Sequence, residues 1–119
     1  MDIETQHTGE FLLSEANGTL SRQNVTLLSG QNLGDGAVLG KVTASGKYKE
    51  FDPAAVDGSQ TAAAILFGDI NATAGDQAAA VIDAVAEVIS AKLVWKAGVT
   101  SGQKTTALAS LRTQLIKAL

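Results

Sequence analysis

The sequence predicts a mainly β domain with one or two short helices, an α+β arrangement, on three observations. Between residues 25 and 66, short apolar runs alternate with glycine-containing turns, and a chain that reverses this often pairs neighbouring strands. A clear helical pattern is confined to residues 101–114. The chain has 119 residues, the size of one domain.

Composition limits the classes of function. Cysteine is absent, which excludes disulfides, thiol nucleophiles and thiolate metal sites. Aromatic residues make up only 4%, so we expect a thin core of Val, Leu, Ile and Ala, which favours stabilisation through an oligomeric interface. The net charge of −3 and the scattered Lys and Arg argue against direct binding of nucleic acid. We find no secretion signal and no membrane-spanning run, and therefore expect a protein that is made in the cytoplasm and does not act at a membrane.

Residues 1–23 are predicted to form a flexible N-terminal arm, and residues 24–119 the β-rich domain. The first ten residues are mostly polar, and Phe11-Leu12-Leu13 is the one short apolar patch before a turn. Ordering a residue costs about 1–2 kcal/mol of backbone entropy, which so small a patch does not offset. The segment is either an ordinary frayed terminus or a tether that orders on a partner, for example by adding a strand to a sheet edge.

The β-rich region divides into strands separated by glycine, proline and aspartate turns. The strand over 61–70 is continuously apolar, so we expect it to be covered on both faces. The single proline, at Asp52-Pro53, suits a loop. The predicted strands are 25–29, 37–43, 48–51 and 61–70.

Residues 78–91 are compatible with either a helix or a pair of strands. Their alanines are strong helix formers. The β-branched content, with polar groups at Asp83 and Glu87, favours strands. Residues 92–96 are predicted to be a further strand that carries Trp95 as the largest core or interface anchor.

Residues 101–114 form the clearest helix. Thr100 and Gln103 have the spacing of a capping box. We expect residues 115–119 to be a short apolar tail. Four apolar side chains fall on one helical face and should pack on the sheet: Ala107, Leu108, Leu111 and Leu115.

None of the motifs that might carry chemistry fits its template. Residues 34–40 place the last glycine of a dinucleotide fingerprint one position late, and neither glycine–lysine pair is followed by the Ser or Thr of a phosphate loop. The single histidine, His7, lies in the predicted arm and leaves no base for a catalytic relay. Asp52 and Asp57 suit turn capping better than calcium binding. We therefore predict no enzymatic activity, no cofactor and no metal.

An ordered series of segments, rather than any single motif, resembles the lambda-type bacteriophage head decoration protein family over roughly residues 10–115. The chain departs from the family pattern at Lys96, where proline is usual, and at the more polar residues 116–119, which puts the edge of a trimer in doubt. The segments are LSRQNVTLLSGQ (20–31), VLGK (38–41), DGSQTAAAIL (57–66), EV (87–88) and LVWKAGVT (93–100).

The resemblance implies a non-enzymatic capsid cement. Members of the family are β-clip-like domains that bind as homotrimers to the outside of the expanded phage head, at its three-fold positions, and hold the shell against DNA pressure. The partner would be the major capsid protein, on which the N-terminal segment orders, and the location the virion after synthesis in the host cytoplasm. The resemblance also favours strands over a helix at 78–91. The residues that it suggests for capsid contact are Phe11, Leu12, Leu13, Leu20, Ser21 and Arg22.

Two other classes of function remain open from the residues. One is a different phage virion module, of the tail or a fibre. The other is a trimeric β-clip nucleotide hydrolase, although the clustered Asp, Arg and Ser motifs of such an enzyme are missing.

Overall fold

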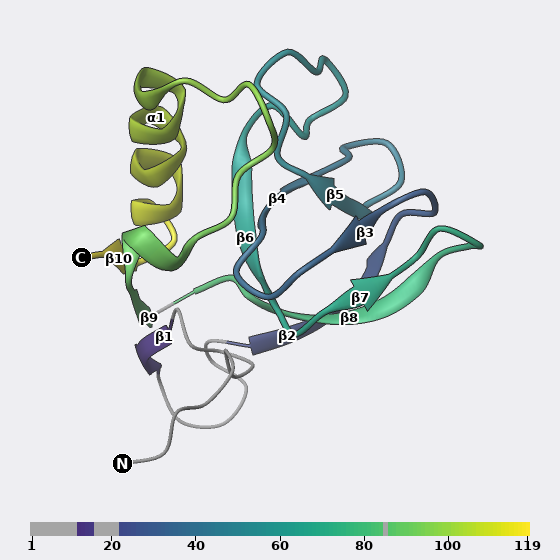
Figure 1. Cartoon of the computed structure of the whole chain (residues 1–119), viewed down its shortest axis with the longest axis horizontal. Helices are drawn as coiled ribbons and strands as arrows, with labels where there is room; N and C mark the ends of the chain where they lie inside the picture. Colours follow the sequence, from purple (N-terminus) through teal and green to yellow (C-terminus); the bar gives the residue numbers. More distant parts are fainter. Residues whose placement is uncertain (1–11, 16–21, 85) are drawn as a thin grey trace.

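A closed β-barrel forms the centre of the protein (Figure 1). The structure, a computed structural model, describes residues 12–15, 22–84 and 86–119. Over these residues the chain is mainly β with one α-helix, as predicted. The barrel strands follow the order β2-β5-β4-β6-β8. Their bounds are Arg22–Leu27 (β2), Val38–Lys41 (β4), Tyr48–Glu50 (β5), Ala62–Phe67 (β6) and Gln77–Ile82 (β8).

Most of the barrel pairs antiparallel, but one seam is parallel. β2 pairs with β8 along its whole length, from Arg22 opposite Ile82 to Leu27 opposite Gln77. β4 and β5 form an antiparallel hairpin, and β6 pairs with both β4 and β8. The barrel closes where β2 meets β5 in parallel, through the single pair Leu27 and Tyr48.

Two small sheets flank the barrel. β3 (Asn32–Leu33) and β7 (Ile70–Asn71) form an antiparallel ribbon. β9 (Ala86–Val88) is the central strand of a three-stranded sheet that we call the terminal sheet. In it, β1 (Leu12–Glu15) pairs antiparallel with β9, and β10 (Ile116–Ala118) pairs parallel on the other side.

The core consists of two clusters, one on each face of β6. Ile65 points into a helix-side core, and Ala64 and Leu66 point into a barrel core, which confirms that this strand is covered on both faces. The helix-side core comprises Val38, Phe51, Ala62, Ile65, Ile82, Ala86, Val88, Leu93, Ala107, Leu111 and Ile116. The barrel core comprises Leu27, Ala37, Leu39, Tyr48, Ala64, Leu66, Ala72, Ala79 and Val81.

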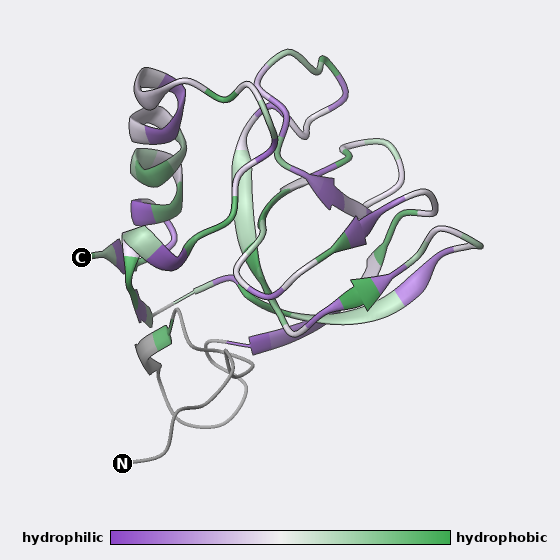
Figure 2. Cartoon of the chain, viewed as in Figure 1, coloured by the Kyte–Doolittle hydropathy of each residue, from purple (hydrophilic) through white to green (hydrophobic). Residues whose placement is uncertain are grey.

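The helix α1 (Ser101–Arg112) contacts β6 and β10. The Thr100 N–H donates to Gln103 Oε1 at 2.8 Å and the Gln103 N–H donates to Thr100 Oγ1 at 3.2 Å, so the predicted capping box is present. Figure 2 shows that the hydrophobic colour of α1 lies mainly in its second half, where Ala107 and Leu111 are buried. Leu115 does not continue this stripe as predicted, because the helix ends at Arg112.

Strands rather than a helix are confirmed at 78–91, as β8 and β9, but the two lie in different sheets and do not pair with each other. The strand expected at 92–96 is wrong. Ser90–Lys92 is a 3-10 helix, and Val94 makes only an isolated bridge to Ala37. The apolar side chains here serve the core instead: Leu93 is buried, and Trp95 packs edge-on against Phe51 with ring centroids 6.0 Å apart.

The expectation of an apolar tail at 115–119 is also wrong. Most of this segment is β10, and Ile116 is buried in the helix-side core. The partner of β10 is β9, a parallel strand about 30 residues earlier in the chain. Such a pairing leaves no local pattern, so residues 115–119 by themselves did not indicate a strand.

The N-terminal segment differs in part from the expected arm. Leu12–Glu15 is a strand on the terminal sheet, and β2 already begins at Arg22. Pairing with β9 supplies backbone hydrogen bonds that a reading of local hydrophobicity does not count. The remainder of the predicted arm, residues 1–11 and 16–21, lies outside the described residues.

The loop between β5 and β6 is held by its two aspartates. Asp52 Oδ1 accepts from the Ala54 N–H, and Asp57 Oδ1 accepts from the N–H and the hydroxyl of Ser59. The Ser59 hydrogen bonds and the ion pair with Lys49 at 3.0 Å hold the pKa of Asp57 well below its usual value. Both aspartates therefore cap turns, as predicted.

Candidate functional site

The predicted contact residues divide into two groups. Leu12 and Leu13 lie in β1, and Arg22 is the first residue of β2. Phe11, Leu20 and Ser21 lie outside the described residues. The surroundings of β1 and of Arg22 are therefore described below.

β1 is an outer strand of the terminal sheet. Leu12 lies opposite Val88, and Glu15 lies opposite Ala86, with an irregularity between Leu12 and Ser14. The Leu12 side chain is partly buried against the helix-side core of the same chain. Only the remaining part of its apolar surface is accessible to a partner. The other edge of β1 faces no strand of the described chain. Backbone donors and acceptors along such an edge can pair with a strand of another protein.

Arg22 extends from the start of β2 over an aromatic ring. Its guanidinium carbon lies 4.1 Å from the centroid of the Phe67 ring, which is close enough for a cation–π interaction. Arg22 also pairs through its backbone with Ile82. The stacking on Phe67 fixes the guanidinium, whose planar set of donors suits carboxylates and backbone carbonyls of a partner.

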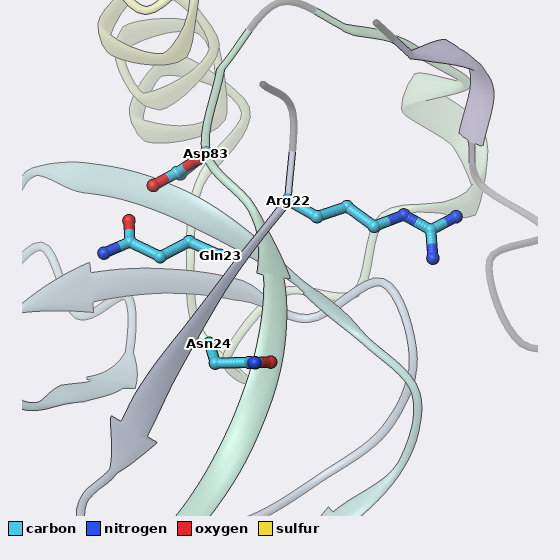
Figure 3. A pocket seen from close by; sticks show the side chains of 4 residues that line it. All are labelled: Arg22, Gln23, Asn24 and Asp83. Carbon is cyan, nitrogen blue, oxygen red and sulfur yellow. The ribbon is translucent and has the colours of Figure 1, made fainter. Parts of the chain in front are cut away.

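A hollow of about 380 Å³ lies beside the first residues of β2, lined by Arg22, Gln23, Asn24 and Asp83. Figure 3 shows the side chains of Gln23 and Asp83 on the same side of β2, with Arg22 directed to the opposite side. This arrangement follows from the alternation of side chains along a strand. The start of β2 thus presents the Gln23 amide beside the Asp83 carboxylate on one face, and Arg22 with Asn24 on the other.

Asp83 is the acidic group of this hollow. Burial raises the pKa of Asp83, and a hydrogen bond from its own backbone N–H opposes the rise. Its backbone carbonyl accepts from Gln114 Nε2 at 2.6 Å, which fixes this turn against the end of α1. Burial raises the pKa of the Tyr48 hydroxyl, and the charge of Asp83 raises it further.

Replacing Asp83 with Asn should stabilise the protein at neutral pH. The folded-state pKa of Asp83 lies above its usual 3.8, so ionisation opposes folding, and stability is lost as the pH rises through this range. We expect Asp83→Asn to raise Tm at pH 7 by up to about 3 °C, since the carboxyl is only partly buried, and to change little at about pH 3. Thermal melts at the two pH values test this.

Asp76→Asn is the matched control, with the opposite sign. Hydrogen bonds from Lys47 and from the Ser29 N–H lower the pKa of Asp76, so its charge favours folding above its usual pKa. Asp76→Asn should lower Tm at pH 7. A loss of stability with Asp83→Asn at pH 7 would show that burial is not what governs Asp83.

The hollow is lined by one carboxylate, two amides and one guanidinium. Over residues 12–15, 22–84 and 86–119, no three His, Cys, Asp or Glu side chains lie where they could hold a metal ion. In the same part of the chain, no helix is long and apolar enough to cross a membrane. The hollow holds one carboxylate and two amides but no nucleophile beside a base, the combination that covalent catalysis requires.

The sequence interpretation missed Gln23, Asn24 and Asp83. Asp83 carried a usable signal, because it directly follows the apolar residues of β8. Gln23 and Asn24 carried none, since exposed polar residues on a strand are common.

Comparison with known proteins gives one family for almost the whole chain. The family model described as "Bacteriophage lambda head decoration protein D" matches residues 2–116. A search of curated proteins found no match.

Proposed function

This chain belongs to the bacteriophage lambda head decoration protein D family, whose members decorate the phage capsid, and from this premise we propose how it attaches. The protein acts as a homotrimeric, non-enzymatic cement of β-clip type, made in the host cytoplasm. It binds the major capsid protein on the outside of the expanded head, at three-fold positions, and stabilises the shell against DNA pressure. The family match over residues 2–116 is the observation that carries the proposal.

We propose that the N-terminal segment is the main contact with the shell. The open edge of β1 is suited to receive or continue a strand of the capsid protein, with Phe11, Leu12, Leu13, Leu20 and Ser21 as contacts. The segment that precedes β1 is then a flexible arm that orders on the shell. Each such contact is weak by itself because ordering the segment costs entropy.

Arg22 and its hollow supply the polar part of the proposed contact. The guanidinium stacked on Phe67 is already restrained, which lowers the entropy cost of binding a capsid carboxylate or carbonyl. The net charge of −3 and the scattered cations argue for a protein surface as the partner and against the packaged DNA.

A trimer makes the attachment firm. Once one subunit has docked, the other two bind at a high effective concentration, and avidity can exceed the affinity of a single contact by about 10²–10⁴. Attachment then depends on the correct spacing of three shell sites. This explains why binding would be restricted to the expanded head, in which the sites have moved to their final positions.

Cosedimentation with heads of the cognate phage tests the proposal. We expect the purified protein to pellet with expanded, undecorated heads, close to one copy per major capsid subunit, and to remain in the supernatant with unexpanded heads. Unexpanded heads also serve as the control for non-specific adsorption. Equal binding to both forms would refute the dependence on expansion, and binding to neither would favour a role elsewhere in the virion.

A further inference from the structure

Leu115 combines two unfavourable properties. Its backbone φ is +64°, in the left-handed region where L residues other than glycine are strained. Its side chain is 67% exposed. Every other described residue with positive φ is a glycine, so elsewhere this chain uses the residue that the conformation favours.

The fold dictates the backbone at this position. The N–H groups of Gln114 and Leu115 donate to Leu111 O and Arg112 O, which closes the last turn of α1. The Gln114 side-chain amide donates to the carbonyls of Ala63, at 2.7 Å, and Asp83, at 2.6 Å. The chain is therefore fixed immediately before Leu115.

The chain is fixed again immediately after Leu115. The Leu115 carbonyl accepts from the Ala86 N–H at 3.1 Å, and Ile116 is buried. The backbone cannot relax out of the left-handed region without breaking these contacts. The turn thus requires a left-handed residue, and glycine would satisfy it. Nothing in the described fold requires a leucine side chain here.

We propose that Leu115 is a second contact with the capsid shell, buried when the protein docks. The inference rests on the proposed function and extends its contact surface. A side chain that costs stability in the free protein and makes little contact with its own fold is explained if it becomes buried in a partner.

The position of Leu115 favours the shell as this partner. Glu15, Ala86 and Ile116 lie side by side across the terminal sheet, from β1 to β10. Because neighbouring strands are about 4.8 Å apart, β1 and β10 are separated by roughly 10 Å. A capsid strand that pairs with the open edge of β1 would lie one spacing further out, roughly 15 Å from β10. A capsid surface that spans the terminal sheet from that edge to β10 would therefore also cover Leu115.

Two substitutions separate the strain from the contact. Leu115→Gly removes the side chain and relieves the strain, whereas Leu115→Ala removes the side chain and keeps the strain. Both should weaken binding to expanded heads by about tenfold or more, because a leucine is no longer buried. Leu115→Gly should melt about 4 °C above Leu115→Ala. Val56→Ala is the matched control, since Val56 is 95% exposed in the loop between β5 and β6, and it should bind as wild type does.

The outcomes distinguish this inference from the proposed function. If wild-type protein and both Leu115 variants bind expanded heads equally, the Leu115 contact is refuted and the cement function stands. If sedimentation equilibrium shows weaker self-association of the Leu115 variants, the partner is a second copy of the chain and the shell contact is refuted, even where head binding also falls through lost avidity. If wild-type protein does not bind heads, both proposals fail.

Discussion

A protein that lacks residues 1–21 should lose binding to expanded heads by at least about 100-fold and still fold. The truncation removes β1 and the proposed contacts from Phe11 to Ser21. It keeps Arg22, which pairs with β8 and stacks on Phe67. Because three segments are lost from each trimer, the avidity that multiplies the single contacts is lost with them.

The barrel should survive this truncation with a modest loss of stability. Leu12 is only partly buried against the helix-side core, so we expect a cost of about 1–2 kcal/mol. Domains of this size are typically stable by about 5–15 kcal/mol. Circular dichroism should therefore show a β-rich protein with a cooperative melt a few degrees lower.

A shorter truncation, of residues 1–11, is the control that keeps β1. Cosedimentation of both truncations with expanded heads shows how binding divides between the strand and the residues before it. Full decoration by the protein without residues 1–21 would contradict the arm as the main contact. An unfolded barrel would show that β1 belongs to the core.

Gly40→Ala, which adds one methyl group, should strongly destabilise the protein. Gly40 lies in β4, where the chain crosses the buried Ser59. A Cβ at this position would contact the carbonyl oxygen of Ser59 and lie 2.5 Å from its Cα, both of them backbone atoms. The strand β4 and the loop that carries Ser59 would have to move apart. We expect a loss of about 3 kcal/mol or more, seen as a fall in Tm of roughly 10 °C or more.

Gly102→Ala is the matched control. Gly102 lies in α1, and a Cβ there would meet no atom within 4 Å. Alanine favours a helix over glycine by roughly 1 kcal/mol, so Gly102→Ala should raise Tm slightly. Thermal melts of both variants test the prediction, and equal Tm values would show that the crossing at Ser59 is not closely packed.

Elements with a local signal could be predicted from the sequence. The β4–β5 hairpin follows from its turn, and α1 follows from the capping box and from Ala107 and Leu111. β10 could not be predicted, because what makes it a strand is a parallel partner, β9, well before it in the chain. The end of α1 was misplaced for a related reason: Leu115 has the helical spacing, and no glycine or proline marks the stop.

The candidate site was less predictable than the fold. Arg22 was identified through the family resemblance, but its position over Phe67 depends on two strands that do not pair directly with each other. The hollow is lined by Arg22 and by Asp83, which directly follows the end of β8 and is far from Arg22 in the sequence. Such neighbours are set by the closure of the barrel and leave no pattern in the sequence.

The parallel seam between β2 and β5 has a consequence for the order of folding. The β4–β5 hairpin closes a short loop and can form early, whereas β2 pairs along its length only with β8. Closing a long loop costs more entropy than closing a short one. The first barrel strand in the chain must therefore wait until β8 has been synthesised, and the pair Leu27–Tyr48 joins β2 to β5 as the barrel closes.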